Sequence, residues 1–131
     1  MRMRVVSIVS VLALVVLASA AKAEERIVPI YVSPSTINLQ WKGESVTVHA
    51  EIPYSQVVSA TVTLDGIPVK ATFADNRGDL VAKFGVDDVK TFLQNIEKPS
   101  MVRLTLAGET TDGRAFSGTD LVKVIDVSGK K

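Results

Sequence analysis

The segment Ser45-Val46-Thr47-Val48-His49-Ala50-Glu51-Ile52 alternates polar and apolar residues at every step. Its apolar residues, from Val46 to Ile52, share one phase, and its polar residues, from Ser45 to Glu51, share the other. Side chains of a β-strand point alternately to opposite faces, so this period of two is typical of a half-buried strand. The segment therefore predicts a strand that buries one face in a core.

The same alternation recurs on both sides of this segment. In Ala60–Leu64 it ends at Asp65-Gly66, a pair that favours a two-residue β-hairpin because both residues tolerate positive φ. Pro68 then predicts an edge strand or a bulge, since proline cannot donate to a neighbouring strand. Further strands are predicted at Ile27–Val32, Thr36–Trp41, Val69–Ala74, Leu80–Phe84, Val102–Ala107 and Phe116–Val127, and turns at Lys42-Gly43, Asp75–Gly78 and Asp112-Gly113.

One segment follows a helical period instead. Its apolar residues recur at spacings of three and four, which predicts an amphipathic helix of about three turns. Asp87 and Asp88 lie in its first turn, where the helix dipole favours anions, and Pro99 lies beyond its end. The apolar face consists of Val86, Val89, Phe92, Leu93 and Ile96. Together these elements predict an all-β protein, an Ig-like β-sandwich of about seven or eight strands with one short helical connection.

The first 23 residues are predicted to be a signal peptide. Arg2 and Arg4 precede the uncharged stretch Val5–Ala20, and Ala21-Lys22-Ala23 supplies small residues for cleavage. The apolar stretch is shorter than the ~20 residues of a membrane-spanning helix, which argues against the alternative of an uncleaved anchor. We therefore expect two parts, a signal peptide at 1–23 and one Ig-like domain at 24–131, and a secreted or periplasmic protein.

Composition limits the classes of partner that we expect for this domain. Loss of the signal peptide removes three basic residues and changes the formal net charge from +1 to −2, with 108 residues remaining. Acidic and basic residues are interspersed, so neither nucleic acid nor an anionic membrane is expected as a partner. The chain has no cysteine, which excludes disulfides, thiolate metal ligands and a cysteine nucleophile. We expect a protein partner, either a second copy or another exported protein, and no membrane insertion of the mature chain.

The stretch Gly108–Asp120 reads Gly-Glu-Thr-Thr-Asp-Gly-Arg-Ala-Phe-Ser-Gly-Thr-Asp. It resembles the closing motif of a family of Ig-like modules of secreted bacterial proteins, Gly-Glu-Thr-x-Asp-Gly-x-x-Phe-x-Gly-x-Asp. The similarity extends over Ile30 to Ile125 and includes the hairpin around Asp65-Gly66. It implies an Ig-like fold and no enzymatic activity. The family's Asp-rich turn, which looks like a calcium loop, is replaced here by a shorter turn with Arg77 among its acids.

Several polar residues are candidates for catalytic or metal-binding sites. His49, the only histidine, is expected to face solvent, because it shares the polar phase of Thr47 and Glu51. It is not expected to be a ligand or a base, because no motif of a hydrolase or zinc enzyme surrounds it. Two acid pairs, Asp75 with Asp79 and Asp112 with Asp120, could be imagined as the acid and base of a glycosidase. Aspartate beside glycine in a turn usually serves the backbone, so we assign them structural roles. Three side chains at Asp75–Asp79 are also too few for the six to eight oxygens that calcium prefers. Neither a metal nor a cofactor is expected.

Two surface motifs were also considered. Arg77-Gly78-Asp79 spells an adhesion tripeptide, but the three residues are also common in turns, and we do not expect a receptor. Trp41, Tyr31 and Tyr54 are the candidates for a sugar platform. Trp41 shares the phase of Ile37 and Leu39 and is expected in the core, whereas Tyr31 is expected to face outward. One exposed aromatic residue is too few for such a platform, and no small-molecule ligand is expected.

The sequence thus predicts an exported, non-catalytic domain with a structural or protein-interaction role. The first alternative is a ligand-binding module for calcium or glycan, acting through the turns at Asp75–Asp79 and Asp112–Asp120. The second is a subunit of an extracellular fibre or surface assembly, built by exchange of the strand Ile27–Val32 between copies. We expect that strand to pair within its own domain, because strands consecutive in sequence usually neighbour each other.

Overall fold

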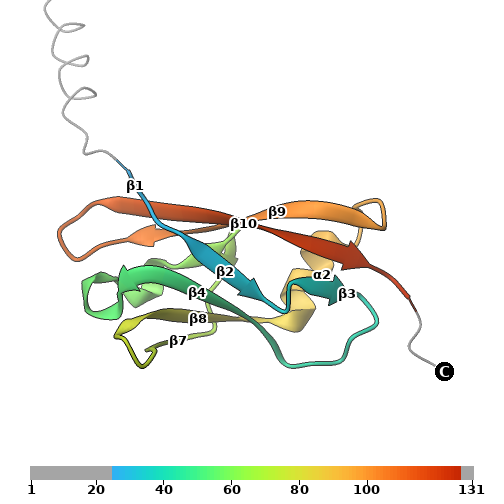
Figure 1. Ribbon diagram of the computed structural model, residues 1–131, viewed down its shortest axis with the longest axis horizontal. Helices are drawn as coiled ribbons and strands as arrows, with labels where there is room; N and C mark the ends of the chain where they lie inside the picture. Colours follow the sequence, from blue (N-terminus) through green and yellow to red (C-terminus); the bar gives the residue numbers. More distant parts are fainter. Residues whose placement is uncertain (1–24, 128–131) are drawn as a thin grey trace, which may run out of the picture.

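A computed structural model describes residues 25–127, which form two sheets joined by one helix (Figure 1). The predicted signal peptide at 1–23 lies outside the described residues. The elements in chain order are β1 (Arg26–Ile27), β2 (Ile30–Ser33), β3 (Thr36–Asn38), β4 (Ser45–Pro53), the 3₁₀ helices η1 (Tyr54–Gln56) and η2 (Ser59–Thr61), β5 (Thr63–Leu64), β6 (Ile67–Pro68), β7 (Ala71–Ala74), β8 (Asp79–Gly85), α2 (Val86–Leu93), β9 (Ser100–Glu109) and β10 (Ala115–Ile125).

The strand order is that of an Ig-like sandwich. One sheet has the order β2-β4-β8-β7, and we call it the four-stranded sheet. The other has the order β1-β10-β9-β5-β6, with β3 also pairing with β10, and we call it the six-stranded sheet. In chain order these correspond to the two sheets, ABED and GFC, of immunoglobulin domains. The predicted all-β sandwich with one helical connection is confirmed.

The described part of the chain has ten strands, compared with the seven or eight that were predicted. The predicted strand Ile27–Val32 is split, because β1 pairs with β10 and β2 pairs with β4 in the other sheet. In addition, Ile67–Pro68 forms the short second strand of the hairpin, paired with Thr63–Leu64. The first of these differences reflects a change of sheet that alternation alone does not reveal.

The core lies between the two sheets and includes the apolar phase of β4. Val46, Val48 and Ile52 have no exposed surface, and Ala50 is 2% exposed, as the alternation in Ser45–Ile52 predicts. Residues of this kind contribute about 1.5–3 kcal/mol each when fully buried. Other fully buried large side chains include Phe84, Phe116, Ile37, Leu64, Leu80, Leu93, Leu104, Leu106 and Val62.

The prediction of a strand over Ala60–Leu64 was wrong in its first half. Residues Ser59–Thr61 form the 3₁₀ helix η2, and only Thr63–Leu64 pair as a strand. The Thr61 side chain donates to the Val58 carbonyl at 2.7 Å, which stabilises the turn over an extended backbone. The hairpin itself is confirmed, because Asp65 has φ 49° and Gly66 has φ 86°, as a type I′ turn requires.

Helix α2 is confirmed, but it is shorter than predicted and ends at Leu93. Asp87 and Asp88 lie in its first turn, and Val86, Val89 and Leu93 face the core. Phe92 is 42% exposed, because the helix turns it away from that face. The helix carries the chain from β8 in the four-stranded sheet to β9 in the six-stranded sheet, and it covers one end of the core.

The predicted strand Thr36–Trp41 also ends early, at Asn38. Backbone and side chain of Asn38 accept hydrogen bonds from Trp41 N at 2.8 Å and Gln40 N at 3.0 Å, which closes a turn. Trp41 is half-buried and packs against the edge of the core, so its expected core position is confirmed in part.

Candidate functional site

The N-terminal segment changes sheets beside β10, and two residues of the closing motif make this possible. A Cβ atom at Gly118 would lie 2.2 Å from the carbonyl oxygen of Val28, so only glycine allows the segment to cross so closely. Two residues further along, Asp120 Oδ2 accepts a hydrogen bond from Val32 N at 2.9 Å. In this structure the segment pairs with β10 and β4 of its own domain, and Asp120 has a structural role.

Asp112, the proposed partner of Asp120 in an acid pair, serves a turn. Its carboxylate accepts a hydrogen bond from the Thr110 hydroxyl, and this bond lowers the pKa of Asp112. Gly113 follows with φ 87° and completes the turn between β9 and β10. Asp112 therefore serves its own turn, as the turn chemistry predicts, whereas Asp120 binds the backbone of a distant segment at Val32.

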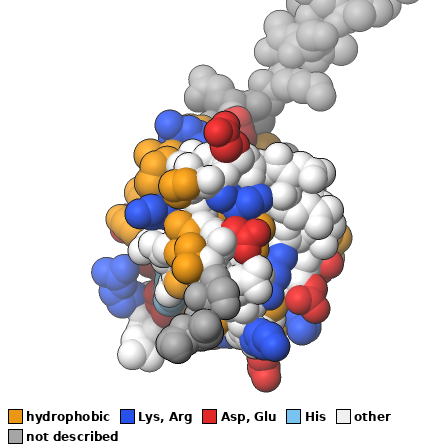
Figure 2. All heavy atoms as spheres, turned by 90° about the vertical axis from the view of Figure 1, so that its right-hand side faces the viewer, with side chains coloured by type: hydrophobic (Ala, Val, Ile, Leu, Met, Phe, Trp, Pro, Cys, Tyr) orange, Lys and Arg blue, Asp and Glu red, His pale blue; other side chains and the backbone are white. Residues whose placement is uncertain are grey.

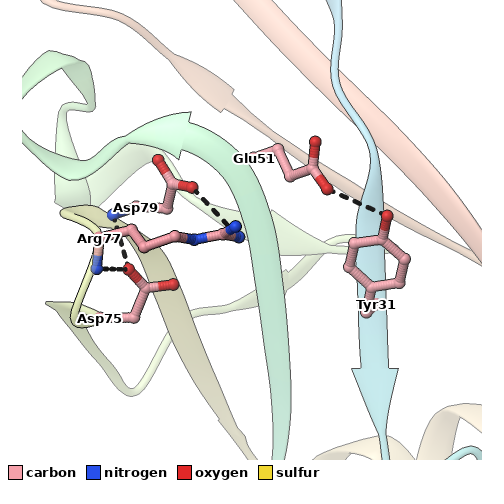
Figure 3. A network of polar contacts seen from close by, with 5 residues as sticks. All are labelled: Tyr31, Glu51, Asp75, Arg77 and Asp79. Carbon is pink, nitrogen blue, oxygen red and sulfur yellow. Dashed lines mark hydrogen bonds and ion pairs between the residues drawn. The ribbon is translucent and has the colours of Figure 1, made fainter.

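The Asp75–Asp79 turn is organised by one carboxylate (Figure 3). Asp75 Oδ1 accepts hydrogen bonds from Arg77 N at 2.8 Å and Asp79 N at 2.9 Å, which lower the pKa of Asp75. Gly78 has φ 86°, and its N–H donates to the Asp75 carbonyl at 2.9 Å. Within residues 25–127, no group of three or more His, Cys, Asp or Glu side chains is placed to hold a metal ion.

Arg77 and Asp79 of the adhesion-like tripeptide interact with each other across Gly78. Their charged atoms are 3.8 Å apart, and Arg77 is largely exposed. Figure 3 shows the Arg77 side chain pointing from the turn toward Glu51 and Tyr31 rather than away from the domain. An exposed pair of this kind contributes little to stability, so its effect is mainly on the charge of this face.

The outer face of the four-stranded sheet carries one row of side chains in register. Pairing aligns Tyr31 of β2 with His49 of β4, His49 with Val81 of β8, and Val81 with Phe73 of β7. We call these four residues the outer row. Tyr31 is 55% and Phe73 44% exposed, whereas Val81 is 1% exposed although it is not part of the core cluster. The outer row therefore places one buried valine on the outside of the sandwich, with an exposed aromatic ring at each end.

Polar groups fix the two ends of the outer row. The Tyr31 hydroxyl donates to Glu51 Oε2 at 3.0 Å, and this bond to an acid raises the pKa of Tyr31. At the other end the Lys83 ammonium lies 5.8 Å from the centre of the Phe73 ring, within the range of a cation–π interaction. Aromatic residues with a polar rim around them are characteristic of protein–protein interfaces.

The hollows of the surface lie elsewhere. The largest, about 780 Å³, lies between the β3–β4 loop and the start of α2, and its rim mixes Lys42, Lys70 and Lys90 with Asp87 and Asp88. A hollow of about 420 Å³ lies beside Trp41, and one of about 430 Å³ lies between Arg26, Gln56 and the Thr110–Asp112 turn. Figure 2 shows the end of the sandwich where β10 runs out, with hydrophobic side chains in small groups between charged ones.

The structure places the predicted candidates as follows. His49 and Tyr31 face solvent, as expected, and Tyr54 is half-buried against the core. Sequence reasoning missed Phe73 and Val81, because their role depends on strand register across the sheet. Alternation does place Phe73, Val81 and His49 within strands, but it does not say which strands are neighbours.

No protein-family model, curated protein or solved structure matches this chain significantly. The resemblance of Gly108–Asp120 to Ig-like modules therefore stays a prediction. Among the described residues, no helix combines the length and the apolar character that crossing a membrane requires.

Proposed function

We propose that this chain is an exported, non-catalytic Ig-like domain that binds a protein partner in the secreted or periplasmic space. The observation that carries the proposal is the outer row. It leaves Tyr31 and Phe73 exposed at its two ends, with Val81 buried between them on the outer face of the four-stranded sheet. Rigid aromatic side chains with polar surroundings supply much of the energy of protein interfaces.

The roles of the acidic residues support a non-catalytic domain. Asp75, Asp112 and Asp120 each accept hydrogen bonds that stabilise the backbone of their own turn or crossing. A general acid or base must instead lie within reach of a substrate in a common site. The acids that a glycosidase reading would need are thus used by the fold.

The charge around the outer row supports a protein partner. Glu51 and Asp79 lie on the same face as Arg77 and Lys83, so this surface offers both signs of charge. Nucleic acids and anionic membranes select surfaces of one sign. A protein surface of matching mixed charge fits this face better.

Export is tested by expressing the chain from Met1 in a bacterial host and measuring its intact mass in the exported fraction. The expected product begins at Glu24 and has lost the basic residues of the leader. A chain that stays in the cytoplasm with its full mass contradicts the exported part of the proposal.

Binding is tested by placing a photo-crosslinking residue at Tyr31 or, as a matched control, at Thr105 on the outer face of the six-stranded sheet. The expected result is a defined adduct with one exported protein from Tyr31 only, reproduced with that protein in purified form. Equal labelling from both positions contradicts binding through the outer row. A calcium titration of the same protein, followed by its melting temperature, tests the calcium alternative.

A further inference from the structure

The edges of the two sheets differ in how their free backbone groups are covered. Unpaired N–H and C=O groups along an edge can pair with another chain, and proteins usually block them with proline, charge or short strands. β6 has two residues, one of them Pro68, and β1 and β3 are short strands that both pair with β10. β2 lies between Pro29 and Pro34, and Asp120 accepts its Val32 N–H.

β7 has none of these devices. Its four residues, Ala71-Thr72-Phe73-Ala74, include neither proline nor a charged side chain, and among the described strands it pairs with β8 alone. Ala71, Phe73 and Ala74 are exposed. β7 is therefore the open edge of the four-stranded sheet, and it carries one end of the outer row.

The backbone groups that face this open edge follow from the pairing with β8. Asp75 N donates to the Asp79 carbonyl at 2.9 Å, so the N–H of Asp75 faces β8. Residues that face the partner strand alternate along antiparallel strands, so Phe73, opposite Val81, and Ala71, opposite Lys83, also face β8. The N–H and C=O groups of Thr72 and Ala74 then point away from β8, toward the open edge.

We infer that a second copy of this chain pairs with β7 in antiparallel orientation about a two-fold axis, which joins the two four-stranded sheets into one. This inference rests on the proposed function and deepens it, since it names one partner of the domain. A two-fold interface must be complementary to itself. β7 meets this condition because Thr72 and Ala74 flank Phe73 symmetrically.

The register of this pairing is set by the hydrogen bonds. If Thr72 of each copy lies opposite Ala74 of the other, all the outward backbone groups of β7 find partners. Phe73 then lies on the axis, directly opposite Phe73 of the second copy, and the exposed rings cover each other. Aromatic pairs directly opposite each other on neighbouring strands favour strand pairing.

Charge is complementary in the same register. Ala71 comes to lie opposite Asp75 of the second copy, and the neighbour of Ala71 on β8 is Lys83. Asp75 therefore approaches a positive charge of the other copy on the outer face. The contact is small, and interfaces of this size are typical of weak, concentration-dependent association.

Because the chain has no cysteine, single-cysteine variants test the register directly. In Phe73→Cys the two thiols of a dimer would face each other, with Cβ atoms close to the separation that a disulfide requires. We expect mild oxidation of the full chain to link Phe73→Cys into dimers at least about tenfold faster than Tyr31→Cys. Tyr31 is the matched control, because it ends the same row at the closed edge.

A second variant keeps the test decisive. Ala74→Pro removes an N–H that faces the open edge, where proline is tolerated in a strand. Added to Phe73→Cys, it should reduce cross-linking to the level of Tyr31→Cys while thermal melting still shows a folded domain. Ala71→Cys should not cross-link to itself, since its partner in this register is Asp75.

The inference is overturned if folded Phe73→Cys cross-links no faster than Tyr31→Cys, or if Ala74→Pro has no effect on its rate. The proposed function fails separately, when the photo-crosslinker at Tyr31 gives no more adduct with a protein than the control at Thr105. A chain that stays monomeric and still forms a specific adduct from Tyr31 keeps the proposed function and rejects self-pairing.

Discussion

β2 and β7 are the two edges of the same sheet, have four residues each, and end the outer row with an aromatic ring. They differ in what happens at their free sides. At β2 the Val32 N–H is bonded to Asp120, a residue 88 positions away on the opposite sheet. At β7 the described chain supplies no such partner strand or carboxylate on the open side. Two edge strands of equal length in one sheet can thus differ in whether their free backbone groups have a partner. The difference depends on which residues the rest of the fold places beside each edge.

The difference shows how one edge of the four-stranded sheet can be covered while the other stays open. Closing β2 requires the N-terminal segment to cross from one sheet to the other past Gly118. The segment gains a buried position for Val28, Ile30 and Val32, which are at most 5% exposed. β7 leaves its edge groups to water or to a partner chain.

At the closed edge, we expect the largest loss of stability from a substitution at Gly118. In Gly118→Val the new side chain would collide with the Val28 carbonyl, and we expect a loss of about 3 kcal/mol in the free energy of unfolding. Thr119→Val, at the adjacent exposed position, should change it by less than about 0.5 kcal/mol. Urea denaturation measures both, and equal stability of the two variants would contradict the crowding at the crossing.

Removing the carboxylate that covers β2 should have the next largest effect. Asp120→Ala leaves the part-buried Val32 N–H without its acceptor and should cost about 2 kcal/mol of unfolding free energy. Asp120→Asn keeps an oxygen in place and should lose clearly less. If both variants are as stable as the original chain in urea, the hydrogen bond to Val32 does not protect this edge.

Amide hydrogen exchange compares the two edges in the unmodified chain. At low protein concentration, the Val32 amide should exchange at least about tenfold more slowly than those of Thr72 and Ala74, because its hydrogen bond must open first. Raising the concentration should slow exchange at Thr72 and Ala74 as β7 pairs with a second copy. Two-dimensional NMR resolves each amide, and equal rates at both edges would remove the contrast between them.

The turn that ends β7 should show the smallest effect, as a change in pH dependence. The lowered pKa of Asp75 means that its contribution to stability is present above the unfolded value of about 3.9 and is lost as pH falls through the lower folded value. Asp75→Asn keeps an oxygen for the turn, so it should weaken the loss of stability in acid. Urea midpoints between pH 7 and pH 3 measure this change.

Asp65→Asn is the matched control with the opposite sign. Burial raises the pKa of Asp65, so its ionised form opposes folding and the cost appears as pH rises above about 3.9. Removing the charge should leave stability at pH 7 unchanged or slightly higher. If Asp65→Asn loses as much unfolding free energy at pH 7 as Asp75→Asn, the charges of the two acids do not have these opposite effects.

Local patterns predicted much of this fold because their physical causes are local. The alternation in Val46–Ile52 reflects one buried face, and Asp65-Gly66 forms its hairpin because both residues accept positive φ. The strand that alternation predicts over Ala60–Leu64 is absent in its first half, because a 3₁₀ turn bonded through Thr61 is favoured there over an extended strand. Turn roles for Asp75 and Asp112 were likewise predictable, since their bonds are to near neighbours.

The sequence by itself determined that the chain forms mainly strands and that one helix interrupts them. It also determined that Asp75 and Asp112 accept hydrogen bonds within turns. It marked Gly118 only as a member of a motif, and it assigned Asp120 to turn chemistry, whereas Asp120 binds Val32 N on the opposite sheet. Tertiary structure decided that Asp120 closes β2, that Val81 is buried outside the core, and that β7 is left open. The physical reason is that an edge is defined by which strands are neighbours, and neighbours are chosen by packing between segments far apart in the chain.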